Sequence, residues 1–417
     1  MIRLVLPIGM LLLGVALLLL GSGALNTLLA LRSEAEGYTA QLIGLIMSAY
    51  FLGFLIGTYT ALPLINRIGH IRAFAFCAAM AACATLLYSL WVNPWWWLLL
   101  RVITGVSLVT LYTVIESWLS EQTPAAQRGK VFAVYMVVHL GALALAQQLI
   151  LLGDVRGYAL FAIAGCLTCA ALMPITWTRL AQPAATDTTR LSPRQLYALA
   201  PVGVVATVLS GLAMSGFWGL GAVYAGRIGL GAAEVAAFMS IAIIGGAVLQ
   251  WPIGHYSDRV DRRSVLLFTA VGASAAAVLM VMLSYAGWLV MVAAFIYGGF
   301  AFSVYPLAVA HVGDHLKPEE MIAGISGLLL LNGIGAALGP ALAGALMTHV
   351  GVHALPLYFC AVQGLLAVSV VMFVRRRAVD TVDHTSHFLP MLRTTPTVLE
   401  MLPDTEGTTE ASATNTN

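Results

Sequence analysis

Long apolar segments separated by short polar stretches run along most of the chain. Twelve segments consist of about 20 or more mostly apolar residues, the length that a helix needs to cross a lipid bilayer. They lie at approximately residues 4–31, 38–65, 73–92, 95–119, 129–153, 157–178, 197–226, 234–254, 264–285, 287–311, 321–349 and 353–375. The pattern predicts an all-α membrane protein with twelve transmembrane helices.

The composition excludes a water-soluble fold and gives no sign of nucleic-acid binding. Of the 417 residues, 60% are hydrophobic and 9% are charged, whereas soluble domains contain roughly 25% charged residues. The net charge is +2, and the positive residues are spread over short loops instead of forming one basic face. A partner other than the lipid bilayer and a small solute is therefore not expected, and DNA or RNA binding is disfavoured.

The positive charges predict the orientation in the membrane. When alternate loops are assigned to opposite sides, one side receives only Arg32, Arg156 and Arg227. The other side receives Arg67, Arg72, Arg128, Lys130, Arg179, Arg190, Arg194, Arg259, Arg262, Arg263, Lys317 and Arg375 to Arg377. By the positive-inside rule the second side is cytoplasmic, together with both termini, in a multi-pass protein of the cell inner (cytoplasmic) membrane.

The two halves of the chain repeat each other at a shift of 192 to 194 residues. The matched residues include Pro7 and Pro201, Arg67 and Arg259, Gly105 and Gly298, Tyr112 and Tyr305, and Glu121 and Asp314. This indicates two pseudo-symmetric six-helix bundles, a common architecture of transporters. We expect bundles at residues 1–178 and 197–377, a cytoplasmic linker at 179–196, and a polar, disordered cytoplasmic tail at 378–417.

The loop after the eighth segment carries the most specific motif. The stretch from Gly254 to Arg263, GHYSDRVDRR, resembles the cytoplasmic loop signature of the major facilitator superfamily, with Asp261 where the family has a glycine. The first-half copy has Asn66 in place of the aspartate and Leu62 in place of a glycine. The resemblance implies a cytoplasmic gate built from Gly254, Asp258, Arg259, Arg262, Arg263, Arg67, Arg72 and Glu116.

A second motif lies in the fourth segment. Arg101 and Gly105 resemble the RxxxG element of the same family. Glu116 shares that helix face but lies roughly 22 Å from Arg101, so the two cannot pair. We expect Glu116 to pair with Arg67 or Arg72; the alternative is a solvated acid at the membrane interface.

The family resemblance covers nearly the whole chain and implies its fold and activity. The chain is most similar in layout to uncharacterised bacterial permeases with short loops, a branch that indicates no substrate. In this family the helices of segments 1, 4, 7 and 10, with those of 2, 5, 8 and 11, surround a central cavity. The resemblance also implies a monomer.

Polar side chains halfway along the inner segments are the candidates for a substrate or proton site. His139 and Asn332 are repeat partners, each about ten residues into its segment and therefore roughly 15 Å deep. Histidine suits proton coupling near neutral pH, although a neutral histidine used in helix packing is the alternative. Further candidates are Tyr112, Tyr305, Arg101, Tyr135, Gln147 and Trp218.

No other chemistry is indicated. All five cysteines lie in apolar segments, and the pair Cys166 and Cys169 has no second pair beside it, so we expect neither a metal site nor a cofactor. Nucleotide-binding, metalloprotease and serine-hydrolase motifs are absent, which argues against an enzyme with catalytic residues.

The sequence predicts a secondary active transporter that works by alternating access and is proton-coupled, either a symporter or an antiporter. An uncoupled facilitator is one alternative; a transporter-like receptor without transport or a membrane-embedded enzyme is the other. Export of an amphipathic compound and import of a small polar metabolite both remain open.

Overall fold

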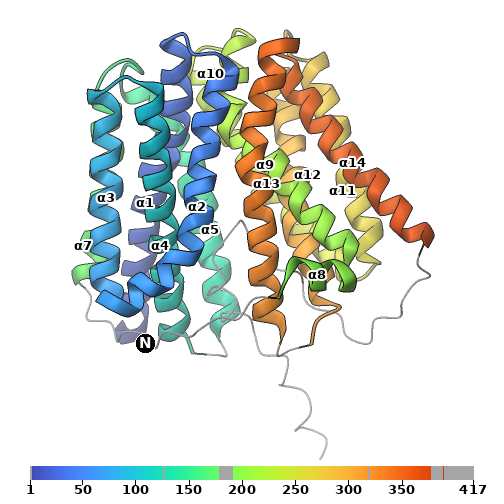
Figure 1. The fold of residues 1–417 in the computed structure, drawn as a ribbon, viewed down its shortest axis with the longest axis horizontal. Helices are drawn as coiled ribbons and strands as arrows, with labels where there is room; N and C mark the ends of the chain where they lie inside the picture. Colours follow the sequence, from blue (N-terminus) through green and yellow to red (C-terminus); the bar gives the residue numbers. More distant parts are fainter. Residues whose placement is uncertain (1, 125–126, 178–190, 318–319, 377–387, 389–417) are drawn as a thin grey trace, which may run out of the picture.

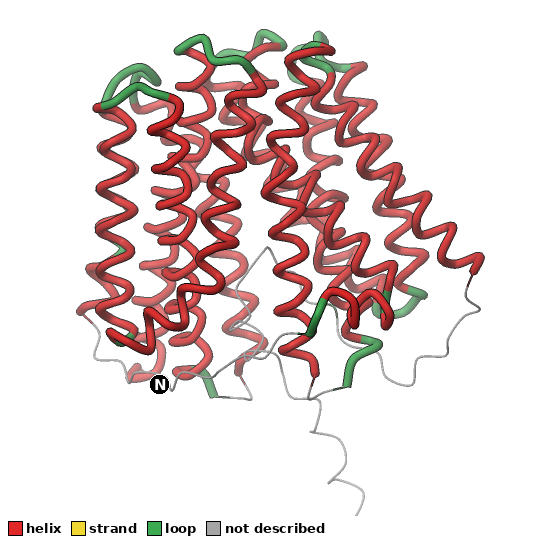
Figure 2. Tube along the Cα trace, in the orientation of Figure 1, coloured by secondary structure: helices red, strands yellow, loops and turns green. Residues whose placement is uncertain are grey.

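The computed structural model describes residues 2–124, 127–177, 191–317, 320–376 and 388. Within these residues the chain forms helices joined by short loops, and no strand is present (Figure 2). Twelve helical segments of the described chain are long and apolar enough to cross a membrane. The predicted all-α fold and the twelve predicted spans are confirmed.

The first half contains six of these spans. Its helices are α1 (Ile2–Ala35), α2 (Ala40–Ile68), α3 (His70–Leu90), α4 (Pro94–Gln122), α5 (Arg128–Gln148), α6 (Ala159–Ala170) and α7 (Leu172–Trp177), and α5 continues into the 3-10 helix η2 (Leu149–Leu152). The span predicted at 157–178 is divided at Ala171 into α6 and α7. Pro174 lies just after this break, and its missing N–H group weakens the helix at that point.

The second half contains the other six spans. Its helices are α8 (Pro193–Leu199), α9 (Pro201–Arg227), α10 (Ala232–Ser257), α11 (Arg262–Met282), α12 (Leu289–Gly313), α13 (Met321–Val350) and α14 (Ala354–Arg376). The short helix α8 lies in the region predicted as linker and starts with a capping box at Ser192. Most of the predicted linker and tail lies outside the described residues, with Phe388 as an exception.

The fourth and seventh spans occupy the middle of the bundle. In each of them 72% of the most apolar window is buried, compared with 44% in the sixth and ninth spans. The sixth and ninth spans present large apolar side chains outward, as a helix facing lipid does. Helices α4 and α9 are therefore in a position to line a central site.

Repeat-related glycines allow two helix pairs to cross in close contact. A Cβ atom on Gly105 would collide with the backbone of α2, and one on Gly298 would collide with the backbone of α10. Gly53 and Gly245 take the same positions on the opposite helices, against Val102 and Phe295. Small residues at these crossings let the backbones of α2 and α4, and of α10 and α12, touch directly.

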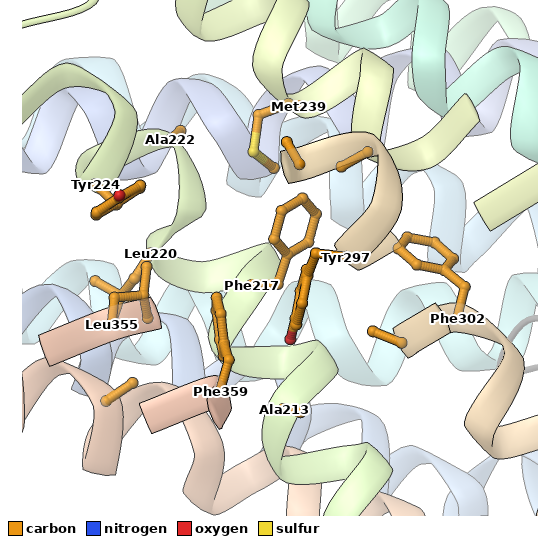
Figure 3. Close-up of a cluster of buried hydrophobic side chains, with 14 of the residues drawn as sticks. Ala213, Phe217, Leu220, Ala222, Tyr224, Met239, Tyr297, Phe302, Leu355 and Phe359 are labelled. Carbon is orange, nitrogen blue, oxygen red and sulfur yellow. The ribbon is translucent and has the colours of Figure 1, made fainter. Parts of the chain in front are cut away.

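Aromatic side chains fill the core of the second half (Figure 3). The rings of Tyr297 and Phe359 stack with centroids 4.9 Å apart, and Phe217 packs against Tyr297 at 6.2 Å. Phe217 also contacts Phe302 of α12, which reaches the interface with the first half. The aromatic core therefore supports one wall of the space between the halves.

The two halves meet at one end of the bundle, which we name the Glu34 end; the opposite end is the Arg262 end. At the Glu34 end, α2 packs against α13 so closely that a Cβ on Gly44 would strike Pro340, and one on Gly344 would strike Ala40. Towards the Arg262 end, α2 turns away from α13 (Figure 1); this part of α2 contains Pro63, and a proline inside a helix is a common cause of a bend.

Candidate functional site

A cavity lies between the two halves, about halfway along the helices. Its volume is about 1150 Å³, including the part open to solvent. Helices α1, α2, α4 and α5 of the first half and α9, α12 and α13 of the second half line it. The aromatic side chains in its wall are Tyr50, Phe51, Phe54, Tyr112, Trp218, Phe302 and Tyr305.

The structure brings most of the predicted cavity residues together. Six of the eight candidates line the cavity: His139, Asn332, Tyr112, Tyr305, Arg101 and Trp218. Two candidates do not. The Tyr135 hydroxyl donates to Glu116 at 2.8 Å, and Gln147 accepts a hydrogen bond from Thr27 at 2.6 Å. Both side chains are fully buried between helices of the first half. They therefore contribute to helix packing and do not line the cavity.

Arg101 is a cavity residue whose charge is always present. Its side chain is buried, and its Nη2 donates to Asn26 at 2.5 Å and contacts the Met47 sulfur at 3.4 Å. The guanidinium carbon lies 4.7 Å from the ring centroid of Tyr50, in a cation–π contact. Its Nε atom is buried, and no described residue accepts a hydrogen bond from it. Arg101 therefore has neutral neighbours that fix its position.

Asn26 connects this arginine to the other half of the molecule. Its side-chain oxygen accepts from Arg101, while its Nδ2 donates to the backbone oxygen of Trp218 at 2.7 Å. Asn26 and Trp218 are 192 residues apart, the spacing of the repeat. The amide thus links α4 through α1 to α9 beside the cavity.

His139 lies on the first-half wall among aromatic rings. Its ring centroid is 6.0 Å from that of Tyr112 and 5.7 Å from that of Tyr135. The side chain is buried, and its Nδ1 atom has no hydrogen-bond partner among the described residues. His139 therefore brings to the cavity wall an imidazole whose Nδ1 atom is not used in hydrogen bonding within the described chain.

Asn332, the repeat partner of His139, lines the cavity from the second half but already makes a hydrogen bond. Its Nδ2 donates to the backbone oxygen of Thr207 at 3.1 Å, which ties α13 to α9. Within the part of the chain that the structure describes, the hydroxyls of Thr207 and Ser210 on α9 have no hydrogen-bond partner, and Ser210 lines the cavity. This wall therefore offers neutral hydrogen-bonding groups.

An ion pair that the sequence did not reveal closes the Glu34 end. Arg227 at the end of α9 donates from Nε and Nη2 to the two carboxylate oxygens of Glu34 in α1, at 2.8 and 2.7 Å. Nearby, Ser240 of α10 donates to Ala144 and accepts from Gln148, both close to the end of α5. These contacts all join one half to the other at the same end of the cavity.

The loop motif of the second half forms a charge cluster at the Arg262 end. Arg262 donates to Asp314 at 2.8 Å, to Asp258 at 3.1 Å and to Ser257 at 3.1 Å. Arg262 and Asp314 have 4% and 7% of their side chains exposed, so this is a buried pair. Arg259 is exposed and Arg263 half-buried; neither forms an ion pair within the described chain.

Phe388, the one residue of the predicted tail that the structure describes, packs on this motif. Phe388 is buried, and its backbone N–H donates to Asp258 at 2.9 Å. Its ring covers Gly254 so closely that a Cβ there would collide with it. The glycine of the motif thus provides the space that the phenylalanine ring occupies.

The predicted pairing of Glu116 with Arg67 or Arg72 is not seen in this structure. Glu116 is fully buried and accepts from Tyr135, whereas Arg67 and Arg72 are exposed and form no ion pair with another described residue. The reason is depth: Glu116 lies inside the bundle, six residues before α4 ends at Gln122. The first half also has Asn66 where the second has Asp258, so it lacks the corresponding cluster.

No group of three or more potential metal ligands occurs within the described part of the chain. The groups of the cavity wall that can contact a solute are therefore an arginine, a histidine, and neutral polar and aromatic side chains.

Sequence comparison agrees with this architecture. The family model described as Major Facilitator Superfamily matches residues 11–302 and 203–398. The chain belongs to the Major Facilitator Superfamily. Among curated relatives, the "Uncharacterized MFS-type transporter YcaD" of Escherichia fergusonii is 29% identical over 82% of this chain and 89% of that protein. The protein of the same name in Escherichia coli K12 is 30% identical over the same shares.

Solved structures with this superfamily fold are also similar. The nucleoside transporter NupG has a TM-score of 0.72 at 15% identity, covering 90% of this chain and 100% of that one. A bacterial homologue of the human lysosomal transporter Spinster has a TM-score of 0.63 at 17% identity, covering 88% and 94%. At these identities the likeness shows the fold alone.

Proposed function

We propose that this chain is a secondary transporter that moves a small solute across the membrane by alternating access. The observation that carries the proposal is the position of the cavity: it lies between two repeat-related halves that are joined at the Glu34 end and diverge towards the Arg262 end. Rocking of the halves about this cavity would expose it to each side in turn.

The charge distribution supports an orientation for this state. The Arg262 end carries most of the loop lysines and arginines, which favours placing it in the cytoplasm of a cell with the chain in its inner membrane. The cavity then faces inward, and the Glu34 to Arg227 pair lies on the outer side. Both termini are cytoplasmic in this arrangement.

We further propose that transport is coupled to protons through His139. Arg101 remains protonated at any physiological pH, and no carboxylate is among the described residues of the cavity wall. His139 is therefore the side chain of this wall whose charge can change when it binds a proton. Its partnerless Nδ1 atom gives the proton a place to bind.

The test is transport by purified protein in proteoliposomes, with a pH-sensitive dye inside and a library of small metabolites outside. Solute-dependent proton flux that is lost in His139→Gln and kept in His349→Gln, a histidine on the exposed surface of α13, is the expected result. Movement of solute that ignores the pH gradient would make the protein a facilitator and His139 a packing residue. Binding without movement would indicate a receptor.

A further inference from the structure

Arg101 is a buried cation in the membrane-spanning core without a carboxylate partner among the described residues. The ion pairs of the described chain all involve other arginines, and the acid on its own helix, Glu116, lies too far away to reach it. Burying an unpaired charge within the bilayer is costly, so such residues are characteristically directed into a site.

The neighbours of Arg101 hold it in place but do not neutralise it. The amide of Asn26, the sulfur of Met47 and the face of Tyr50 are all uncharged. Its Nη2 atom makes the contacts with Asn26 and Met47, and Nε has no acceptor among the described residues. A guanidinium with fixed orientation and spare N–H donors matches the two oxygens of a carboxylate.

The rest of the wall limits what can be attached to that carboxylate. It supplies aromatic faces from both halves, such as Tyr112 and Trp218, and neutral polar groups such as Ser210. No acid is present in the described wall to attract a cation, and a second fixed cation for a dianion is also missing from it. The wall is complementary to one negative charge and an apolar or aromatic body.

We propose that the cavity binds an organic monoanion, a carboxylate with an apolar or aromatic body, and that Arg101 binds the carboxylate. The inference rests on the proposed transport function, since it names the solute class of the same cavity. Because Asn26 contacts both Arg101 and the Trp218 carbonyl, a carboxylate that draws the guanidinium towards the cavity would also affect the contact between the halves.

The proposal is tested by ligand binding to the purified protein. Binding is measured as the shift of the unfolding temperature and as a Kd from tryptophan fluorescence. The probes are benzoate and phenylacetate, with benzamide as the neutral, benzylamine as the cationic and phthalate as the dianionic counterpart. We expect saturable binding of the monocarboxylates and weaker binding of the other three. Arg101→Gln should raise the Kd of the monocarboxylates by about tenfold or more, because a charge-assisted hydrogen bond is lost.

A matched variant and a second reading separate this loss from misfolding. Arg156→Gln removes an arginine that is exposed in the loop at the Glu34 end, and it should bind monocarboxylates like the unchanged protein. Without ligand, Arg101→Gln should unfold at a temperature no lower than the unchanged protein, because it removes an unpaired buried charge.

Three results would overturn the inference. They are equal binding of benzamide or benzylamine, absence of carboxylate binding by folded protein, and a ligand-free Arg101→Gln variant that is clearly less stable. None of these outcomes decides whether the cavity is exposed alternately to both sides, which is measured without any solute by cysteine labelling. Failure of the solute class and failure of the transport mechanism are therefore distinguishable.

Discussion

Glu34 and Arg227 are related by the internal repeat and form a two-pronged ion pair across the interface of the halves, 193 residues apart. Each stands at the Glu34 end of the first membrane span of its half, so the pseudo-symmetry brings them face to face. One member is acidic and the other basic, which makes the contact attractive although the positions are equivalent.

Loss of this pair should loosen the Glu34 end only slightly. The two side chains are 27% and 34% exposed, and partly exposed pairs contribute at most about 1 kcal/mol. Arg227→Gln should therefore raise labelling of a cavity cysteine from the Glu34 side by no more than about fivefold. The exchange of both charges, Glu34→Arg with Arg227→Glu, should restore the labelling rate of the unchanged protein. An unchanged labelling rate in Arg227→Gln would show that the pair does not help to close the Glu34 end.

The helix crossing beside the pair should matter more. A Cβ on Gly44 would collide with the backbone of Pro340 in the other half, and a backbone yields less readily than the end of a side chain. Gly44→Ala should favour the state in which α2 and α13 separate at the Glu34 end, and so increase labelling from that side by more than Arg227→Gln does. Gly141→Ala is the control, because no atom of the described residues lies within 4 Å of its Cβ position.

The crossings inside each half should affect stability instead of gating. Gly105→Ala and Gly298→Ala would push α2 away from α4 and α10 away from α12, and overpacking of this kind costs about 1–3 kcal/mol. Both variants should unfold at clearly lower temperature in detergent than Gly141→Ala. Equal unfolding temperatures would contradict the close crossings described here.

The buried charge cluster at the Arg262 end should be sensitive to removal of one partner. Arg262→Gln removes the arginine that pairs with the buried carboxylate of Asp314, and breaking a buried pair costs about 3–5 kcal/mol. The double variant Arg262→Met with Asp314→Leu should lose much less stability, because both charges of this buried pair are removed together. The stability of both variants is measured by heating the protein while its circular dichroism is recorded. A similar loss of stability in the single and the double variant would contradict the buried pair.

The positions of the spans and the duplication were predictable because each depends on a local property. A bilayer imposes the length of every apolar segment, and the repeat preserves glycines such as Gly105 and Gly298 at equivalent crossings. His139, Asn332 and Arg101 were found because a polar side chain stands out in an apolar segment. The shared depth of His139 and Asn332 then placed both at the cavity.

What the sequence did not predict depends on helix rotation and on the state of the transporter. Tyr135 follows the same helix face as His139 yet points to Glu116, and a difference of part of a turn cannot be obtained from spacing. The cavity rings of Tyr50 and Phe302 resemble ordinary apolar residues in the sequence. The Glu34 to Arg227 pair did have a signal, opposite charges at the repeat spacing, but only a conformation closed at that end brings them together.

The most direct test of alternating access is the labelling of one cavity position from both sides of the membrane. In protein without its five native cysteines, Ser210→Cys is treated with a membrane-impermeant maleimide from each side. The labelling is then repeated in a protein that also carries Glu34→Cys and Arg227→Cys, after these two cysteines have been joined by a short bifunctional cross-linker. We predict labelling from both sides before cross-linking and from the Arg262 side alone afterwards. Labelling from both sides in the cross-linked protein, or from one side only in the free protein, would contradict alternating access.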